Sequence, residues 1–203
     1  MIKIVFATNN AHKVSEFRDC FKQAGVEAQI LTIKETGFKG EIVEDADSFE
    51  GNAYIKAKAL CDFTNLIAVA DDSGLSVNAL GGAPGVYSAR FAGENATDDE
   101  NIDKLISELK KLGNCDRSAK FVCTMCVCRP DGKTLFVSGE SHGKIIDERV
   151  GDGKFGYDPI FFYEPMSKTF AEMSSEEKNS VSHRGSAVKE LLKHKDFFLE
   201  SND

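Results

Sequence analysis

The first part of the chain alternates apolar stretches with segments of helical periodicity. Residues 3–8 are mostly apolar and predict a strand, and the spacing of apolar residues over 10–24 predicts a helix that Gly25 ends. A second strand is expected at 28–33, followed by a polar loop that continues to Glu44. This alternation of strands and helices indicates an α/β protein.

A second helix is expected to begin near Asp47 and to end at about Phe63. Glu50 follows Asp47 by three positions, which is the spacing of a capping box. Residues 66–70 are all apolar, as in a short strand that is covered on both faces. Two aspartates follow directly, so the prediction places both carboxylates at the end of this strand.

The second part of the chain contains strands that pair with one another. The sequence "PDGK" lies between two stretches rich in β-branched and aromatic residues and predicts an antiparallel hairpin, so the whole sheet should be mixed. There is neither an internal repeat nor a low-complexity linker, and we expect a single domain over 1–203 with a tail from about 195. The elements expected here are a helix opened by Thr97 and Glu100 and ended by Gly113, strands at 118–129, 134–142, 144–146 and 160–162, and a last helix from Ser182 or Gly185 to Lys193.

Composition and charge limit the possible functions. Hydrophobic residues make up 41% and charged residues 29% of the 203 residues, which is the balance of a soluble globular protein. No apolar stretch reaches the roughly 18 residues of a membrane span, and the first residues lack the pattern of a signal peptide, so we expect a cytoplasmic protein without membrane contact. The net charge of −8 disfavours nucleic acid as a partner, although a local cluster of Lys and Arg can still bind phosphate.

Three of the six cysteines lie in the stretch "KFVCTMCVC". Cys123 and Cys126 have the C-x-x-C spacing of a metal knuckle or a redox pair. Their neighbours are β-branched or aromatic, however, and successive side chains of a strand point to opposite faces, so these two thiols should point away from each other. We therefore expect buried, reduced cysteines that act as small apolar residues, together with Cys128.

The motif "TNNAHK" lies where the first strand passes into the first helix. Ligands of α/β sheets gather beyond the carboxyl ends of strands, and helix N-termini attract anions. Thr8, Asn9 and Asn10 offer hydroxyl and amide groups, and Lys13 adds a positive charge one turn into the helix. The stretch could cradle a triphosphate; the alternative is an Asn helix cap with Lys13 in solvent.

Asp71 and Asp72 are the second candidate motif. Two neighbouring carboxylates that stay ionised are well explained by a bound cation, and oxygen ligands suit Mg²⁺. Adjacent residues of a strand face opposite sides, so one carboxylate could hold metal while the other orients and deprotonates water. The alternative is that one of them caps a turn and the other is solvated.

Two further motifs are less specific. The stretch "KNSVSHRG" contains Lys178, His183 and Arg184, which are donors for phosphate or for a carbonyl oxygen, or else part of a solvated basic loop. The stretch "GDGKFG" has G-x-G-x-x-G spacing, but Pro159 follows it where a dinucleotide fingerprint would open a helix. A serine hydrolase built on Ser73 and His183 is compatible with the spacing but has no motif in its favour.

Taken together, these stretches resemble the inosine triphosphate pyrophosphatase family, which removes non-canonical purine triphosphates. The matching segments occur in the family's order and reach from residue 3 to about 192, so the resemblance covers nearly the whole chain. They are "TNNAHKV", "SFEGNAYIKAKA", "ADDSGLSVNALGGAPGVYSARFAG", "GKFGYDPIF" and "AEMSSEEKNSVSHRGSA".

The resemblance implies a two-lobed α/β fold around a long mixed sheet, with a nucleotide cleft between the lobes, in a homodimer. It implies Mg²⁺-dependent hydrolysis of ITP, dITP or XTP to the monophosphate and pyrophosphate. Asp72 resembles the general base and a metal ligand, Asp71 its acidic neighbour at the metal, and Glu44 the other metal carboxylate, with Glu41 as a weaker candidate. The substrate-binding residues that it implies are Thr8, Asn9, Asn10, Ala11, His12, Lys13, Lys56 and Ser73 for the phosphates, Phe155, Gly156, Tyr157 and Asp158 at the purine, and Lys178, His183 and Arg184 for the base and its 6-oxo group.

Donors aimed at a 6-oxo group would explain why ATP is rejected. A 6-amino purine would face donor with donor, a mismatch of about 1–3 kcal/mol per buried unpaired group. The chain departs from the family at one motif, which usually reads S-F-x-E-N-A but here has Gly51 before Asn52. If the family's Glu supports metal binding or Lys56, its loss would weaken the site, and glycine also lowers helix stability by roughly 1 kcal/mol relative to alanine.

Three other functions compete with this interpretation. A related pyrophosphatase could act on pyrimidine or modified nucleotides, which a nucleotide panel would separate. A nucleotide-binding regulator without turnover is disfavoured by the presence of Asp71, Asp72 and Lys13. A nucleic-acid-binding role is disfavoured by the acidic balance of the chain.

Overall fold

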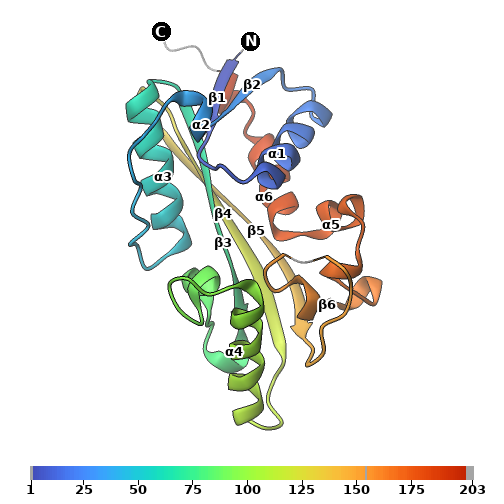
Figure 1. Ribbon diagram of the computed structural model, residues 1–203. Helices are drawn as coiled ribbons and strands as arrows, with labels where there is room; N and C mark the ends of the chain where they lie inside the picture. Colours follow the sequence, from blue (N-terminus) through green and yellow to red (C-terminus); the bar gives the residue numbers. More distant parts are fainter. Residues whose placement is uncertain (1, 154, 200–203) are drawn as a thin grey trace. The chain divides into compact units, whose positions relative to one another are not determined.

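A sheet of seven strands is the framework of the computed structural model, which describes residues 2–153 and 155–199. In this part of the chain the strand order is β2-β1-β3-β4-β5-β6-β7 (Figure 1). β1 pairs parallel with β2 and β3, whereas β6 pairs antiparallel with β5 and β7, so the sheet is mixed and the predicted α/β class is confirmed. The strands are β1 (Ile2–Phe6), β2 (Ala28–Thr32), β3 (Ile67–Val77), β4 (Ser118–Cys128), β5 (Thr134–Ile145), β6 (Phe161–Tyr163) and β7 (Lys168–Thr169).

The chain divides into two compact units. The first comprises the residues up to Asp72, residues 123–139 and the residues from Arg184 onward, and the second comprises Ser73–Val122 and Glu140–His183. β3, β4 and β5 contribute residues to both units. The chain passes from one unit to the other inside three of the stretches that the sequence analysis singles out, after Asp72, Val122 and His183. Each unit is described by itself below.

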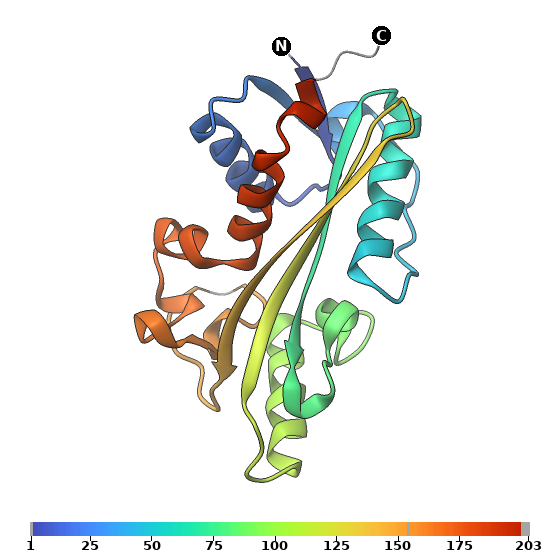
Figure 2. The ribbon, with the colours of Figure 1, turned by 180° about the vertical axis from the view of Figure 1, so that it is seen from behind.

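In the first unit, helices cover both faces of the strands. α1 (Ala11–Gln23) and α6 (His183–Lys193) pack on one face, and α3 (Phe49–Thr64) packs on the other (Figure 2). On the first face the Phe17 ring lies 4.4 Å from that of Phe6. On the α3 side the helix contributes small residues that let it approach the strands closely. The small residues are Ala53, Ala57 and Cys61, and the larger Leu60 is buried with them.

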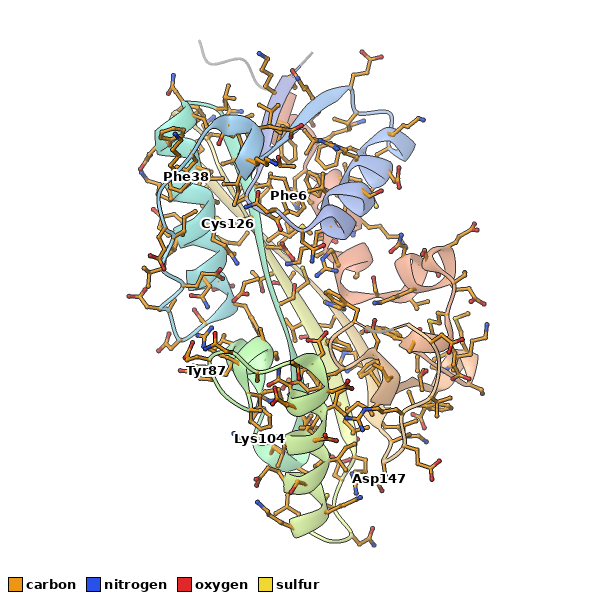
Figure 3. The ribbon with its side chains drawn as sticks, viewed as in Figure 1. Phe6, Phe38, Tyr87, Lys104, Cys126 and Asp147 are labelled. Carbon is orange, nitrogen blue, oxygen red and sulfur yellow. The ribbon has the colours of Figure 1, made fainter. Side chains whose placement is uncertain are left out.

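The cysteines of β4 confirm the strand interpretation. Cys123 belongs to the core beneath α1, whereas Cys126 and Cys128 belong to the core beneath α3. All three are buried and none of them is in a disulfide (Cys126 is labelled in Figure 3). The alternation of a strand therefore separates the two thiols of the C-x-x-C spacing.

In the second unit, α4 (Asp98–Lys111) closes a separate core. The predicted capping box is confirmed, because the Thr97 amide donates to Glu100 Oε2 at 2.7 Å and the Glu100 amide donates to Thr97 Oγ1 at 3.2 Å. One apolar face of the helix packs against residues of β3, β4 and β6. The buried residues of this core include Leu75, Ile102, Leu105, Leu109, Phe121, Phe161 and Phe170.

Three short helices occupy segments where a loop, a motif and a tail were expected. They are α2 (Ile33–Thr36), α5 (Ser175–Val181) and α7 (Asp196–Leu199). α2 and α5 each begin with a capping box that stabilises a helix too short to show a periodic pattern. Short 3₁₀ helices are found in the described residues at η1 (Asn78–Leu80), η2 (Gly85–Arg90), η3 (Asp158–Ile160), η4 (Glu164–Met166) and η5 (Phe170–Glu172).

Two predicted boundaries were wrong. β3 does not end before the aspartates but runs for 11 residues through both of them. α3 is capped by Ser48, whose hydroxyl accepts from the Gly51 amide at 3.1 Å, and not by Asp47. Among the described residues, no helix combines the length and the apolar character that crossing a membrane requires.

Candidate active site

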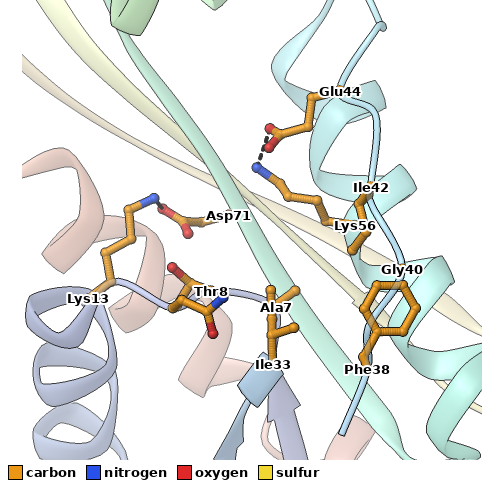
Figure 4. A pocket seen from close by; sticks show the side chains of 11 residues that line it. Ala7, Thr8, Lys13, Ile33, Phe38, Gly40, Ile42, Glu44, Lys56 and Asp71 are labelled. Atoms are coloured by element: carbon orange, nitrogen blue, oxygen red, sulfur yellow. Dashed lines mark hydrogen bonds and ion pairs between the residues drawn. The ribbon is translucent and has the colours of Figure 1, made fainter. Parts of the chain in front are cut away.

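The turn between β1 and α1 presents a row of polar groups. The Asn10 side-chain oxygen accepts from the Lys13 amide at 3.3 Å and so caps the first turn of α1. The backbone N–H of Asn10 in turn donates to Thr8 Oγ1 at 3.1 Å. Asn10 is therefore a helix cap, as one of the two predictions for this motif had it. The same prediction placed Lys13 in solvent, which is wrong, because its ammonium group contacts Asp71 (Figure 4). The side chains of Ala11 and His12 lie outside the described part of the chain.

Asp71 and Asp72 lie in the middle of β3 and contact different helices. Asp71 is 2% exposed and accepts from Lys13 Nζ at 2.8 Å, and Arg184 Nε lies 3.4 Å from the same oxygen. Asp72 accepts from Asn52 Nδ2 of α3 at 3.1 Å. Burial by itself would raise the pKa of Asp71, but the Lys13 and Arg184 cations outweigh it and hold this pKa well below its ordinary range. A charged pair can persist inside the strand because each carboxylate has its own partners.

Glu44 and Asp72 both approach Lys56. Glu44 Oε2 lies 2.5 Å and Asp72 Oδ1 lies 3.8 Å from the Lys56 ammonium nitrogen. The two carboxylates thus converge on one cation, and their oxygens are of the kind that Mg²⁺ prefers. No group of three His, Cys, Asp or Glu side chains with the spacing of a metal cluster occurs in the described ranges.

A polar cavity of about 360 Å³ in the first unit is lined by Lys13, Glu44, Lys56 and Asp71, but not by Asp72. Figure 4 shows Lys13 beside Asp71 and Lys56 beside Glu44 on its walls. Glu44 lines this cavity, while Glu41 is exposed, which favours Glu44 of the two predicted carboxylates. The remaining lining residues are Ala7, Thr8, Asn9, Ile33, Phe38, Gly40 and Ile42.

In the second unit, a set of aromatic and charged residues surrounds Phe155. The Phe155 ring is 47% exposed, and the Lys178 ammonium lies 5.4 Å from its centre. Lys178 also forms an ion pair with the buried carboxylate of Asp158. An exposed aromatic face beside a fixed cation can stack on a flat base.

Two contacts hold the loop that carries Phe155. Asp98, at the start of α4, accepts from the Gly156 amide at 2.7 Å. The buried Tyr157 hydroxyl donates to the Ser88 carbonyl at 2.8 Å. Burial, with a smaller contribution from Asp98, raises the pKa of Tyr157 well above its ordinary value, so this group stays a neutral donor.

His183 is buried, and its ring stacks on Phe121 with centroids 4.8 Å apart. Ser73 is half-buried on β3 in the same unit. The structure therefore groups Lys13, Asp71 and Arg184, and Glu44, Lys56 and Asp72, in the first unit, and Phe155, Lys178 and Asp158 in the second. Among the described interactions, none joins Ser73 or His183 to the Phe155 set. Their roles in binding a substrate stay predictions.

Sequence reasoning missed two residues of these sets, Asn52 and Asp98. Asn52 lies four positions before Lys56, so the helical repeat puts both side chains on the same face of α3. That spacing could have identified Asn52 beside Asp72. Asp98 carries no comparable signal, because it contacts a loop 58 positions away.

The mixed α/β sheet, with carboxylates and ammonium groups around one polar cavity, is typical of a class of protein: α/β enzymes that bind anionic substrates. The particular family follows from comparison with known proteins. Residues 4–194 match the model of the Ham1 family, and the chain belongs to this family. The resemblance to the inosine triphosphate pyrophosphatases is thereby confirmed.

Curated relatives are similar over most of their length. The chain is 49% identical over 188 residues to a dITP/XTP pyrophosphatase of Desulfotalea psychrophila, covering 93% of this chain and 82% of that protein. It is 45% identical to a dITP/XTP pyrophosphatase of Bacillus subtilis, covering 95% and 96%.

Solved structures are similar as well. The Ham1 protein of Staphylococcus aureus has a TM-score of 0.86 and 41% identity over 96% of this chain and 98% of that one. A HAM1 protein of Coxiella burnetii has a TM-score of 0.90 and 38% identity over 97% and 100%.

Proposed function

We propose that this enzyme hydrolyses non-canonical purine nucleoside triphosphates, namely dITP, ITP and XTP, to the monophosphate and pyrophosphate. The relatives that match nearly the whole chain are named for this activity. The observation that carries the proposal is that the two aspartates of β3 have different partners. Asp71 contacts Lys13 and Arg184. Asp72 contacts Asn52 and lies near Lys56. Cations of the kind that bind a polyphosphate thus lie beside two neighbouring carboxylates, of which we assign Asp72 to the attacking water.

In the proposed mechanism, Asp72 accepts the proton of the attacking water, oriented by the Asn52 amide. Thr8 to Lys13 and Lys56 bind the phosphates through amide, hydroxyl and ammonium groups. Glu44 and Asp72 would hold Mg²⁺, which neutralises phosphate charge when bound. Asp71 would adjoin that metal and, through its ion pairs, orient Lys13 and Arg184.

The second unit would recognise the base. Phe155 would stack on the purine, and Gly156, Tyr157 and Asp158 would shape the pocket beside it. Lys178 and His183 would donate to the 6-oxo group. Arg184, the third donor that the resemblance implies, belongs to the first unit and is paired there with Asp71. Ser73 would contact phosphate.

We further propose a homodimer, to be tested by light scattering, and a cytoplasmic location, where the nucleotide pool is dissolved.

A nucleotide panel with Mg²⁺ and a pyrophosphate readout tests the function. We expect kcat/KM for ITP, dITP and XTP to exceed that for ATP by about 10- to 100-fold, since each unpaired buried donor costs about 1–3 kcal/mol. Faster cleavage of dUTP than of ITP would favour the rival activity on pyrimidine nucleotides. ITP binding without pyrophosphate release would favour a regulator.

Asp98→Ala tests the base-binding half separately. Losing the contact to the Gly156 amide should loosen the loop that carries Phe155, and we expect KM for ITP to rise by about 10-fold, the effect of a lost charge-assisted hydrogen bond. Binding of inorganic triphosphate, which has no base, should stay unchanged by calorimetry. Glu108→Ala removes an exposed acid from the same helix and serves as the control. An equal loss of triphosphate binding would contradict the assignment.

A further inference from the structure

The position of Glu44 depends on the loop that precedes α3. Three contacts tie this loop to the beginning of the helix. Glu44 pairs with Lys56, the Ala46 amide donates to Asn52 Oδ1 at 3.0 Å, and Ser48 Oγ accepts from the Gly51 amide at 3.1 Å. The loop therefore lies directly against the first two turns of α3.

Asn52 links the loop to Asp72. Its oxygen accepts from the loop at Ala46, and its amide nitrogen donates to Asp72 Oδ2 at 3.1 Å. Only this orientation of the amide satisfies both partners, because an amide hydrogen requires an acceptor and a carboxylate offers no donor. A shift of the loop would consequently disturb both Glu44 and the side chain that holds Asp72.

Gly51 lies where the loop comes nearest to the helix. A Cβ atom at this position would be 2.5 Å from Ala46 Cβ and 3.1 Å from Ser48 Oγ. Carbon atoms in contact are normally about 3.5–4.0 Å apart, so any side chain would push the loop outward. Backbone conformation does not require glycine here, since Gly51 lies within α3 and does not have a positive φ.

Glycine inside a helix lowers helix stability relative to alanine, so its presence needs a compensating reason. We propose that Gly51 is a positioning residue, whose missing side chain lets the loop over residues 44–48 lie close enough for Glu44 and Asn52 to hold their places at Lys56 and Asp72. The catalytic consequence rests on the proposed function; the steric one does not.

Gly51→Ala tests the steric part by hydrogen exchange of the Ala46 amide, which needs no substrate. Alanine favours the helix more than glycine does, so helix propensity alone would predict unchanged or slower exchange of the Ala46 amide. We expect this exchange to become at least tenfold faster, because the added Cβ pushes the loop away from the helix. Ala46→Gly in the Gly51→Ala background removes the closest clash and should restore most of the protection. Glu50→Ala changes an exposed neighbour in the same turn and should alter this exchange by no more than about twofold.

The catalytic part is read from ITP turnover and from the Mg²⁺ concentration that gives half-maximal rate. We expect Gly51→Ala to lower kcat at least tenfold and to raise that concentration, with recovery in the double variant. Unchanged exchange at Ala46 in Gly51→Ala, or faster exchange that Ala46→Gly does not reverse, would overturn the proposal. If wild-type protein releases no pyrophosphate from ITP, the proposed function fails, while the exchange data still decide the steric role of Gly51.

Discussion

Asp72→Asn is expected to lower kcat for ITP by about 10²- to 10⁴-fold, the range for loss of a general base. The amide has the size of the carboxylate and can still accept from Asn52 Nδ2, which lies 3.1 Å from Asp72 Oδ2. It cannot take a proton from water at neutral pH. ITP affinity, measured by calorimetry, should change only a few-fold, because the phosphate-binding groups around Lys13 remain.

The matched control for this variant is Asp62→Asn. Asp62 is an exposed aspartate on α3 that pairs with Lys58, so its substitution should leave both kcat and affinity near wild type. A wild-type rate in Asp72→Asn would refute the general-base assignment. A loss of affinity as large as the loss of kcat would instead assign Asp72 to binding.

Asp71→Ala is expected to lower the free energy of unfolding by about 3–5 kcal/mol, the usual result of removing one partner from a buried ion pair. The side chains of Lys13 and Arg184 are only 20% and 10% exposed, so without Asp71 their charges lie in a poorly solvated place. Urea unfolding measures the effect. Removing Lys13 as well should recover part of the loss, and full additivity of the two changes would contradict the coupling.

The pH dependence of the same group has a definite sign. The pKa of Asp71 is lowered by folding, so its stabilising contribution is present above the unfolded value of about 3.9 and is lost as the pH falls through the lower folded value. The stability difference between wild type and Asp71→Asn should therefore be constant near neutral pH and should shrink only below about pH 4. A difference that already vanishes between pH 7 and 5 would assign it to another group.

Local sequence rules located most elements of the fold. The capping box of Thr97 and Glu100 opens α4 as predicted, and the alternation around Cys123 and Cys126 separates their side chains as expected. Such features depend on residues within a few positions of one another. The family motifs are equally local, which is why the resemblance could be recognised before the fold was known.

Features that depend on distant partners were not predictable in the same way. β3 continues through Asp71 because Lys13 and Arg184, 58 and 113 positions away in the sequence, compensate its charge. The role of Gly51 could not be anticipated either, since the atom it makes room for belongs to Ala46, outside the helix. From its sequence neighbours alone, Asp71 indicated the end of a strand, and Gly51 indicated a position that destabilises a helix.

By itself, the sequence determined the α/β class, the family and the kinds of side chain that form the site, because periodicity, caps and motifs are properties of neighbouring residues. Only the tertiary structure decided which cation each carboxylate meets, that Asn52 joins the loop of Glu44 to Asp72, and that the absence of a side chain at Gly51 matters. The physical reason is that electrostatic compensation and steric contact act through space, at distances that no spacing along the chain encodes.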